Sequence, residues 1–240
     1  MINELWHGGP KFEDHPDVFP ISTDSVLLAY YAKSVGSMRA VDLCCGSGII
    51  SILLALRNPR LTITGVEIQP VAAELASRNA ALSDVTDRMN VLNADIRRHK
   101  EFFKAGEFDL TVSNPPYFVD GRGIKPAEET ARAARIEDLC TLEDLCSAAS
   151  YITRWGGSFT LVHRPDRLVD VFSELIKFGF QPKRIRFVHH DVKSLPCLVL
   201  IDSRRGGKPS LNVEAPLILT NEDGSKTDEY KSIYREGGQL

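Results

Sequence analysis

The residues best suited to chemistry stand in two short runs, Asp42 to Gly48 and Asn114 to Tyr117. The first run, Asp-Leu-Cys-Cys-Gly-Ser-Gly, follows a short apolar segment and precedes a stretch with helical spacing. Two glycines at such a junction let the backbone approach a ligand closely at the N-terminus of a helix. The first run therefore predicts a site that suits several nucleotide-like ligands.

Asp42 narrows the choice of ligand. A carboxylate at the end of the strand repels a pyrophosphate, whereas it can hold the ammonium group of a methionine moiety. A dinucleotide fingerprint normally has an apolar residue at this position, and a third Gly or Ala where this chain has Ser51. The sequence therefore favours S-adenosylmethionine over NAD as the cofactor.

Two further acidic residues support the same site. Glu67 ends the second apolar segment, and Asp95 follows the third. In a doubly wound sheet these positions share one edge, where Glu67 is expected to bind both ribose hydroxyls and Asp95 the adenine amine. Either carboxylate alone is equally consistent with a solvated strand end, but three in this order indicate one ligand. The cofactor contacts expected from these segments are Asp42, Cys44, Gly46, Gly48, Glu67, Ile68, Asp95, Ile96 and Asn114.

The second run, Asn114-Pro115-Pro116-Tyr117, directly follows a fourth apolar segment and is expected at the same edge. The prolines restrict the backbone, so the Asn114 side chain and the Pro115 carbonyl become two preset hydrogen-bond acceptors. Such acceptors favour a pyramidal nitrogen in a conjugated amine, which localises its lone pair toward an electrophilic methyl group. Tyr117 offers a face on which a planar base can stack. Out of context the run indicates only a rigid turn, but its place after a strand favours a catalytic role for all four residues.

The elements that must position these runs repeat between Ala40 and Leu200 as an apolar run, a turn and a helical pattern. This order predicts an α/β fold, a doubly wound, mostly parallel seven-stranded Rossmann-like sheet with helices on both faces. The expected strands are 40–43, 62–67, 89–93, 108–113, 158–163, 184–189 and 197–201. The expected helices are 49–57, 71–82, 142–152 and 167–178.

The 240 residues, 43% of them hydrophobic, are expected to form one globular body. We expect an N-terminal segment (1–39) that covers the cofactor, a core (40–205) and a C-terminal appendage packed on it (206–240). The polar segment from Pro116 to Leu142 is typical of a functional lid or a disordered loop. The start lacks a signal peptide and no run is long enough to span a membrane, so a cytoplasmic protein is predicted. The five cysteines show no metal-ligand spacing, and no metal is predicted.

The D-x-x-x-G-x-G turn and the N-P-P-Y run together resemble class I S-adenosylmethionine-dependent amino-N methyltransferases. The chain is most similar to the bacterial tRNA1(Val) (adenine(37)-N6)-methyltransferases, on Phe19–Ala29, His163–Leu168 and Tyr230–Tyr234. The first of these segments covers the cofactor in that family, which adds Thr23 and Asp24 to the expected contacts. Residues 4–18 and 131–137 depart from the family pattern. The resemblance implies adenosine 37 of a tRNA as the substrate.

Three alternatives remain open. Protein-glutamine methyltransferases of release factors share the tetrapeptide, but usually carry a helical domain where this chain has about 40 residues. Many guanine-specific rRNA methyltransferases have a duplicated domain that this length excludes. A non-catalytic S-adenosylmethionine-binding module is disfavoured because Asp42, Gly46, Gly48, Asn114 and Tyr117 are all intact.

Local charge favours RNA as the partner, although the formal net charge of -3 gives no overall attraction to a polyanion. Clustered basic residues in loops can still neutralise phosphates. The expected RNA contacts lie near Arg122, Lys125, Lys183, Arg184, Arg186, Arg204, Arg205 and Lys208.

Overall fold

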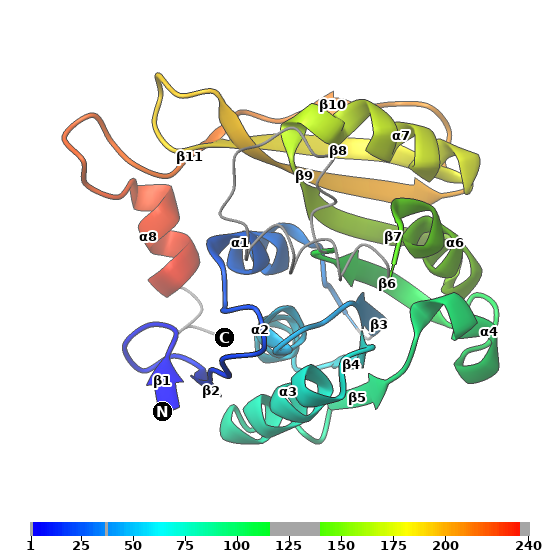
Figure 1. The fold of residues 1–240 in the computed structure, drawn as a ribbon. Helices are drawn as coiled ribbons and strands as arrows, with labels where there is room; N and C mark the ends of the chain where they lie inside the picture. The colour runs from blue at the N-terminus through cyan, green and yellow to red at the C-terminus, as the bar shows by residue number, and fades with distance from the viewer. Residues whose placement is uncertain (1, 37, 116–139, 236–240) are drawn as a thin grey trace.

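A computed structural model of the chain describes residues 2–36, 38–115 and 140–235, and its central feature is a nine-stranded sheet (Figure 1). The strands of this sheet are β3 (Met38–Leu43), β4 (Leu61–Glu67), β5 (Met89–Asn93), β6 (Phe108–Ser113), β7 (Thr153–His163), β8 (Phe180–His189), β9 (Pro196–Arg205), β10 (Asn212–Val213) and β11 (Leu217–Ile218). Their order across the sheet is β10-β8-β9-β7-β6-β3-β4-β5, with β11 also paired to β8.

The seven longer strands confirm the predicted doubly wound fold. Every neighbouring pair among them is parallel except those of β9, which runs antiparallel to both β7 and β8. The carboxyl ends of β3, β4, β5 and β6 therefore meet at one edge, and we call it the carboxyl edge. The two remaining strands, β10 and β11, contain two residues each and were not predicted, because so short a segment carries no readable periodicity.

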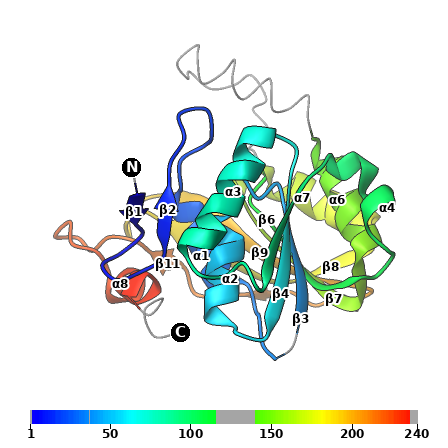
Figure 2. The same ribbon diagram turned by 90° about the horizontal axis from the view of Figure 1, so that it is seen from below.

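The helices cover both faces of the sheet, as Figure 2 shows. On one face lie α1 (Thr23–Tyr31), α2 (Ile49–Arg57) and α3 (Pro70–Leu82), and on the other α4 (His99–Phe102), α6 (Leu142–Ile152) and α7 (Leu168–Lys177). Short 3₁₀ turns precede α4 and α7, namely η1 (Ile96–Arg98) and η2 (Pro165–Arg167). The pattern predicted α2, α3, α6 and α7, whereas α1 and α4 were missed.

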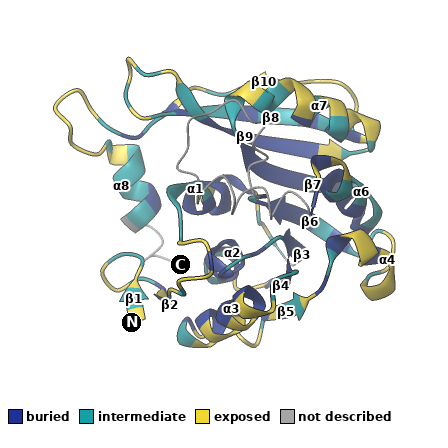
Figure 3. Cartoon of the chain, in the orientation of Figure 1, coloured by how far each residue is buried: buried dark blue, intermediate teal, exposed yellow. Residues whose placement is uncertain are grey.

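Two hydrophobic clusters fill the space between the sheet and its helices, and they account for the continuous apolar runs in the central strands. Ala40 and Val112 belong to the cluster under α1 and α2, whereas Val41 and Leu161 belong to the cluster under α6 and α7. Successive strand residues point to opposite faces, so a strand covered on both sides is apolar at every position. Figure 3 shows this burial along the central strands.

The two ends of the described chain pack on the face of the sheet that α1 covers. Strands β1 (Ile2–Glu4) and β2 (Lys11–Glu13) form a separate antiparallel pair, and helix α8 (Asp228–Arg235) contacts α1. Trp6 meets Tyr234 edge to face with ring centroids 6.2 Å apart, which joins the N-terminal segment to α8. Within the described ranges, no helix combines the length and apolar character needed to cross a membrane.

Candidate active site

The turn between β3 and α2 has the backbone conformation that its glycines predict. Gly46 and Gly48 have φ angles of 53° and 83°, and Cys44 also lies in the left-handed region at 62°. A Cβ on Gly48 would come within 3.0 Å of Ala76, so this glycine allows α3 to pack closely. A Cβ on Gly46 would meet nothing within 4 Å, so Gly46 leaves open space beside the turn. A ligand can therefore approach the backbone at Gly46.

Asp42 lies at the end of β3 and is fully buried. Its Oδ2 accepts a hydrogen bond of 2.8 Å from the Ser51 hydroxyl in the first turn of α2. Its Oδ1 is buried without a hydrogen-bond partner in the part of the chain that the structure describes. Burial raises the pKa of the Asp42 carboxyl to about 7. An acceptor of this kind is costly unless a ligand group completes it.

Glu67, at the end of β4, is the second buried carboxylate of the site, with 5% of its surface exposed. Its two oxygens accept hydrogen bonds from the backbone N–H groups of Gly46 at 2.9 Å and Gln69 at 3.0 Å. Burial raises the pKa of this carboxyl as well. Within the described ranges neither Glu67 nor Asp42 forms an ion pair with Lys or Arg. Two buried carboxylates without a protein cation fit a ligand that carries positive charge, such as a sulfonium with an ammonium group.

The buried Asp42 carboxyl gives a stability prediction. A carboxyl whose pKa is higher in the folded than in the unfolded chain stabilises the fold at low pH, and this contribution is lost as pH rises toward the folded value. The wild-type free energy of unfolding should therefore fall between the ordinary pKa of 3.8 and the folded value of about 7, relative to an Asp42→Asn variant, which carries no charge at any pH. Denaturant unfolding of both ligand-free proteins across this range measures the difference. A difference that stays constant with pH would contradict the burial of a titrating carboxyl.

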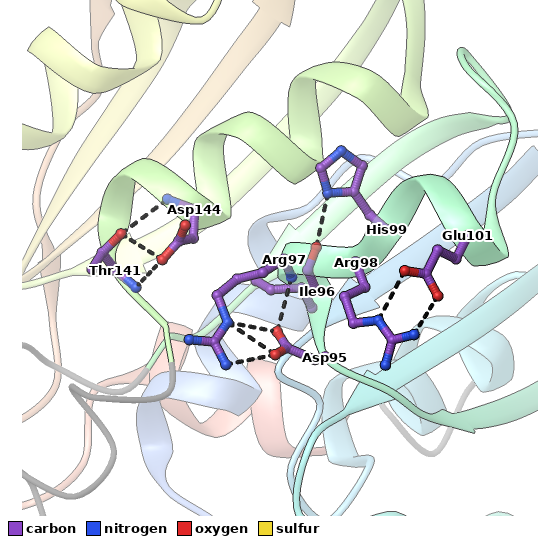
Figure 4. A network of polar contacts seen from close by, with 8 residues as sticks. All are labelled: Asp95, Ile96, Arg97, Arg98, His99, Glu101, Thr141 and Asp144. Atoms are coloured by element: carbon purple, nitrogen blue, oxygen red, sulfur yellow. Dashed lines mark hydrogen bonds and ion pairs between the residues drawn. The ribbon is translucent and has the colours of Figure 1, made fainter.

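Asp95 caps η1, and Figure 4 shows its side chain held by Arg97. The carboxylate accepts the Arg97 backbone N–H at 2.9 Å and also pairs with the Arg97 guanidinium, at 2.6 Å between Nη2 and Oδ2. The Arg97 hydrogen bonds hold the pKa of this carboxyl below its ordinary value. The start of α6 lies nearby in the same view, closed by the Thr141 and Asp144 capping box. Contact between Asp95 and an adenine amine stays a prediction.

Asn114 is brought to the same edge by two hydrogen bonds from different parts of the chain. The Ser113 hydroxyl donates to the Leu43 carbonyl at 2.7 Å, which fixes the end of β6 beside the glycine turn. The Asn114 Nδ2 donates to the Ser25 hydroxyl of α1 at 3.0 Å. With the amide nitrogen so directed, the Oδ1 of Asn114 can accept a hydrogen bond from a substrate. Pro115 is buried beside it, whereas Pro116, Tyr117, Arg122 and Lys125 lie outside the described residues.

The remaining expected cofactor contacts lie in α1, in η1 and in the loops after β3 and β4. Thr23 and Asp24 form the first turn of α1, and the Thr23 hydroxyl accepts a weak hydrogen bond of 3.4 Å from the Tyr234 hydroxyl. Ile96 is buried in η1, while Ile68 and Cys44 are half-buried. These positions are compatible with a role at the carboxyl edge, and their contact with a ligand stays a prediction.

Three supporting residues were missed from the sequence, namely Ser25, Ser51 and Asn79. Asn79 is fully buried in α3, accepts the Glu13 backbone N–H at 2.7 Å and donates to the Ser47 carbonyl at 3.0 Å. It thereby ties the N-terminal segment to the glycine turn. A polar residue four positions after Leu75, on the apolar side of the helix, was a readable signal for Asn79. Ser25 and Ser51 carried no comparable signal.

Six of the basic residues expected to bind RNA lie in or just after β8 and β9. Lys183, Arg184 and Arg186 lie within β8 rather than on a loop. Arg184 pairs with Asp202 and Glu214, each at 3.1 Å, and Arg186 pairs with Glu229 at 2.6 Å. Both guanidinium groups are paired and their side chains are only 16% exposed, so the structure gives no support to the expected RNA contact by Arg184 and Arg186.

The pair Arg204 and Arg205 ends β9, and Lys208 follows it. Because β9 is antiparallel to β7, its end lies at the edge of the sheet opposite the carboxyl edge. A contact of RNA with these three residues is therefore separate from the candidate active site.

Comparison with known proteins agrees with this geometry. Residues 11–137 match the family described as methyltransferase small domain. Proteins named tRNA1(Val) (adenine(37)-N6)-methyltransferase are 33% identical over 150 residues in a Flavobacteriaceae bacterium and 36% over 157 residues in Porphyromonas gingivalis. These matches cover 62% and 63% of this chain, and 62% and 61% of the two relatives, so the chain matches about three fifths of their length.

A solved structure supports the fold. The crystal structure of a predicted O-methyltransferase from Agrobacterium tumefaciens superposes with a TM-score of 0.74 at 24% identity. The superposition covers 90% of this chain and 97% of that one. At this identity the likeness establishes the arrangement of strands and helices.

Proposed function

The chain belongs to the methyltransferase small domain family, and we propose that it methylates the exocyclic N6 amine of an adenine in RNA, at adenosine 37 of a tRNA. Membership of the family implies S-adenosylmethionine as the methyl donor. The observation that carries the proposal is the position of Asn114, whose side chain is oriented by Ser25 at the same sheet edge as two buried carboxylates that pair with no cation among the described residues.

The residues that we expect to hold the cofactor follow from their burial and charge. The Oδ1 of Asp42, which has no hydrogen-bond partner in the described ranges, suits the ammonium group, and Glu67 suits the ribose hydroxyls while it keeps its bond to the glycine turn. The open space at Gly46 allows close approach of the ligand to the backbone. We further propose that residues 1–39 cover the cofactor, because Asn79 links Glu13 to the glycine turn. Residues 40–205 then form the catalytic core, with 206–240 packed on it.

The chemistry asked of the protein is orientation of the amine. When bound, S-adenosylmethionine supplies an electrophilic methyl group. The Asn114 Oδ1 accepts a hydrogen bond from an N–H of the target amine and favours a pyramidal nitrogen. The lone pair of that nitrogen is then localised and can point toward the methyl group. The same acceptor stabilises the positive charge that develops on the nitrogen, and the proton can leave after methyl transfer. Catalysis therefore depends on placement and electrostatics, and no general base is needed before the transfer.

The substrate assignment draws on the relatives. Both relatives described above carry a name that specifies adenine 37 and N6 of a tRNA. A planar conjugated amine is also the kind of nucleophile that the Asn114 acceptor activates. The exocyclic amine of guanine and the side-chain amide of glutamine are also planar and conjugated, so the experiment must identify the methylated atom.

A nucleoside assay tests this proposal. The purified protein should transfer label from S-adenosylmethionine to bulk tRNA taken from a source strain in which the gene is deleted, and N6-methyladenosine should appear after nuclease digestion. Mass spectrometry identifies the product, and tRNA from the parent strain is the control because its site is already methylated. Label in N2-methylguanosine, or transfer to release-factor protein with none to tRNA, would replace the proposed substrate.

A further inference from the structure

Trp155 is an exposed aromatic residue far from the candidate active site. It lies near the start of β7, and 74% of its surface is exposed. A Cβ on Gly206 would come within 2.1 Å of Trp155 Cζ2, so one part of the indole rests on this glycine just after β9. The glycine has a φ of 65°, a conformation that L side chains rarely adopt. The backbone thus supports Trp155 from one side and leaves most of the ring in solvent.

Basic side chains lie beside two neighbouring glycines, Gly156 and Gly207. An Arg204 Nη2 and an Arg154 Nη1 lie 3.7 and 3.9 Å from the position of a Cβ on Gly156. Arg154 also pairs with Asp109, whereas the Arg204 guanidinium forms no ion pair with any residue that the structure describes. Lys183 approaches from β8, with its Cε 2.9 Å from the corresponding position on Gly207. Asp109 balances only the Arg154 charge, so an anion beside these glycines would relieve the remaining repulsion among Arg204, Lys183 and Arg154.

We propose that Trp155, Arg154, Arg204 and Lys183, which we call the Trp155 face, bind the RNA substrate at a second place. The proposal rests on the proposed function for the identity of the RNA. An unpaired base stacks on the indole, and the guanidinium groups bind phosphate oxygens. The pairing of an open aromatic ring with convergent guanidinium groups favours nucleic acid over an acidic protein segment, because a base can stack on the indole while its own phosphate reaches the arginines.

The distance between Trp155 and Asn114 decides whether the Trp155 face can affect the chemical step. Trp155 lies in the irregular part of β7 between Thr153, which is level with Phe108, and Ser158, which is level with Leu110. Asn114 follows these β6 residues by four to six positions, so at about 3.3 Å per residue the separation along the strand is roughly 13–20 Å. An RNA that fills the active site must extend this far to reach the Trp155 face. The face therefore contributes to RNA affinity and leaves the chemical step unchanged.

Steady-state kinetics with bulk tRNA from the deletion strain tests the face. Trp155→Ala should raise the KM for tRNA about tenfold, with kcat and the affinity for S-adenosylmethionine unchanged. Trp155→Phe should keep most of the affinity, because an aromatic face remains. Arg204→Glu should raise KM and flatten the salt dependence of tRNA binding. Arg60→Glu is the matched control, since it reverses an exposed charge just before β4, which β6 and β3 separate from β7 in the sheet.

Fluorescence separates this proposal from the proposed function. The chain has two tryptophans, Trp6 and Trp155, and bulk tRNA should quench an emission component that is absent in Trp155→Ala. This titration needs no methyl transfer, so it gives an answer even if tRNA is not methylated. Unchanged KM values in Trp155→Ala and Arg204→Glu, without quenching that depends on Trp155, would overturn the proposal. Quenching by polyglutamate but not by tRNA would also overturn it and assign the face to an acidic protein.

Discussion

Replacement of Asn114 by alanine is expected to lower the rate of methyl transfer about 10²–10³-fold, with little change in the affinity for S-adenosylmethionine. The reason is that the Asn114 acceptor matters most when the target nitrogen becomes pyramidal and gains charge. An interaction stronger in the transition state than in the ground state lowers the rate when it is removed, with little effect on binding. The Ser25 bond to Nδ2 indicates which atom faces the substrate.

Single-turnover transfer of label at saturating tRNA measures this step directly. Ser25→Ala provides a graded companion, because it removes the group that orients the Asn114 amide but leaves the acceptor, and we expect a fall of about tenfold. Calorimetry with S-adenosylmethionine serves as the folding control for both variants. An Asn114→Ala enzyme with a near-normal rate would remove the mechanism, whereas a Ser25→Ala rate as low as that of Asn114→Ala would indicate structural damage.

The core strands were predictable because a strand that is buried on both faces is apolar at nearly every position. Segments such as Phe108–Ser113 and Met89–Asn93 were predicted with the bounds that the structure shows. Helix α1 was missed because Val26 to Ala29 are all buried, so that its sequence lacks an exposed face with helical spacing. Helix α8 was missed for another reason, since only Ile233 among its described side chains is buried.

The position of the acidic residues of the candidate site was predictable from the order of the strands. Asp42 and Glu67 end parallel strands, and topology alone places them at one edge. Ser25 hydrogen-bonds to Asn114, far along the chain, and Ser51 hydrogen-bonds to Asp42 across the glycine turn. A single serine in a helix gives no sign of such a partner in the sequence. The basic run in β8 shows the converse limit, because its sequence gives no sign of the acidic partners on β9 and α8 that pair with Arg184 and Arg186.

The second large effect is expected for the cofactor itself. Asp42→Ala should weaken S-adenosylmethionine binding about 10–100-fold, the range for loss of a hydrogen bond to a charged group. Asp109→Ala is the matched control on a neighbouring strand, since Asp109 pairs with Arg154 at the opposite edge of the sheet. Calorimetric titration should leave the Asp109→Ala affinity close to wild type. Equal affinities for the two variants would remove Asp42 from the site.

The pH dependence of binding gives an independent test of the same carboxylate. With a pKa of about 7 in the ligand-free protein, Asp42 is largely protonated at pH 6 and must lose its proton to receive an ammonium group. Affinity should therefore rise between pH 6 and pH 7.5, by at most tenfold per pH unit, because one proton is released on binding. Calorimetry in buffers of different ionisation enthalpy counts that proton, and Asp42→Asn should release none while it keeps the shape of the site. If wild type and Asp42→Asn release the same number of protons at pH 6, the titrating group lies elsewhere and Asp42 does not bind the ammonium.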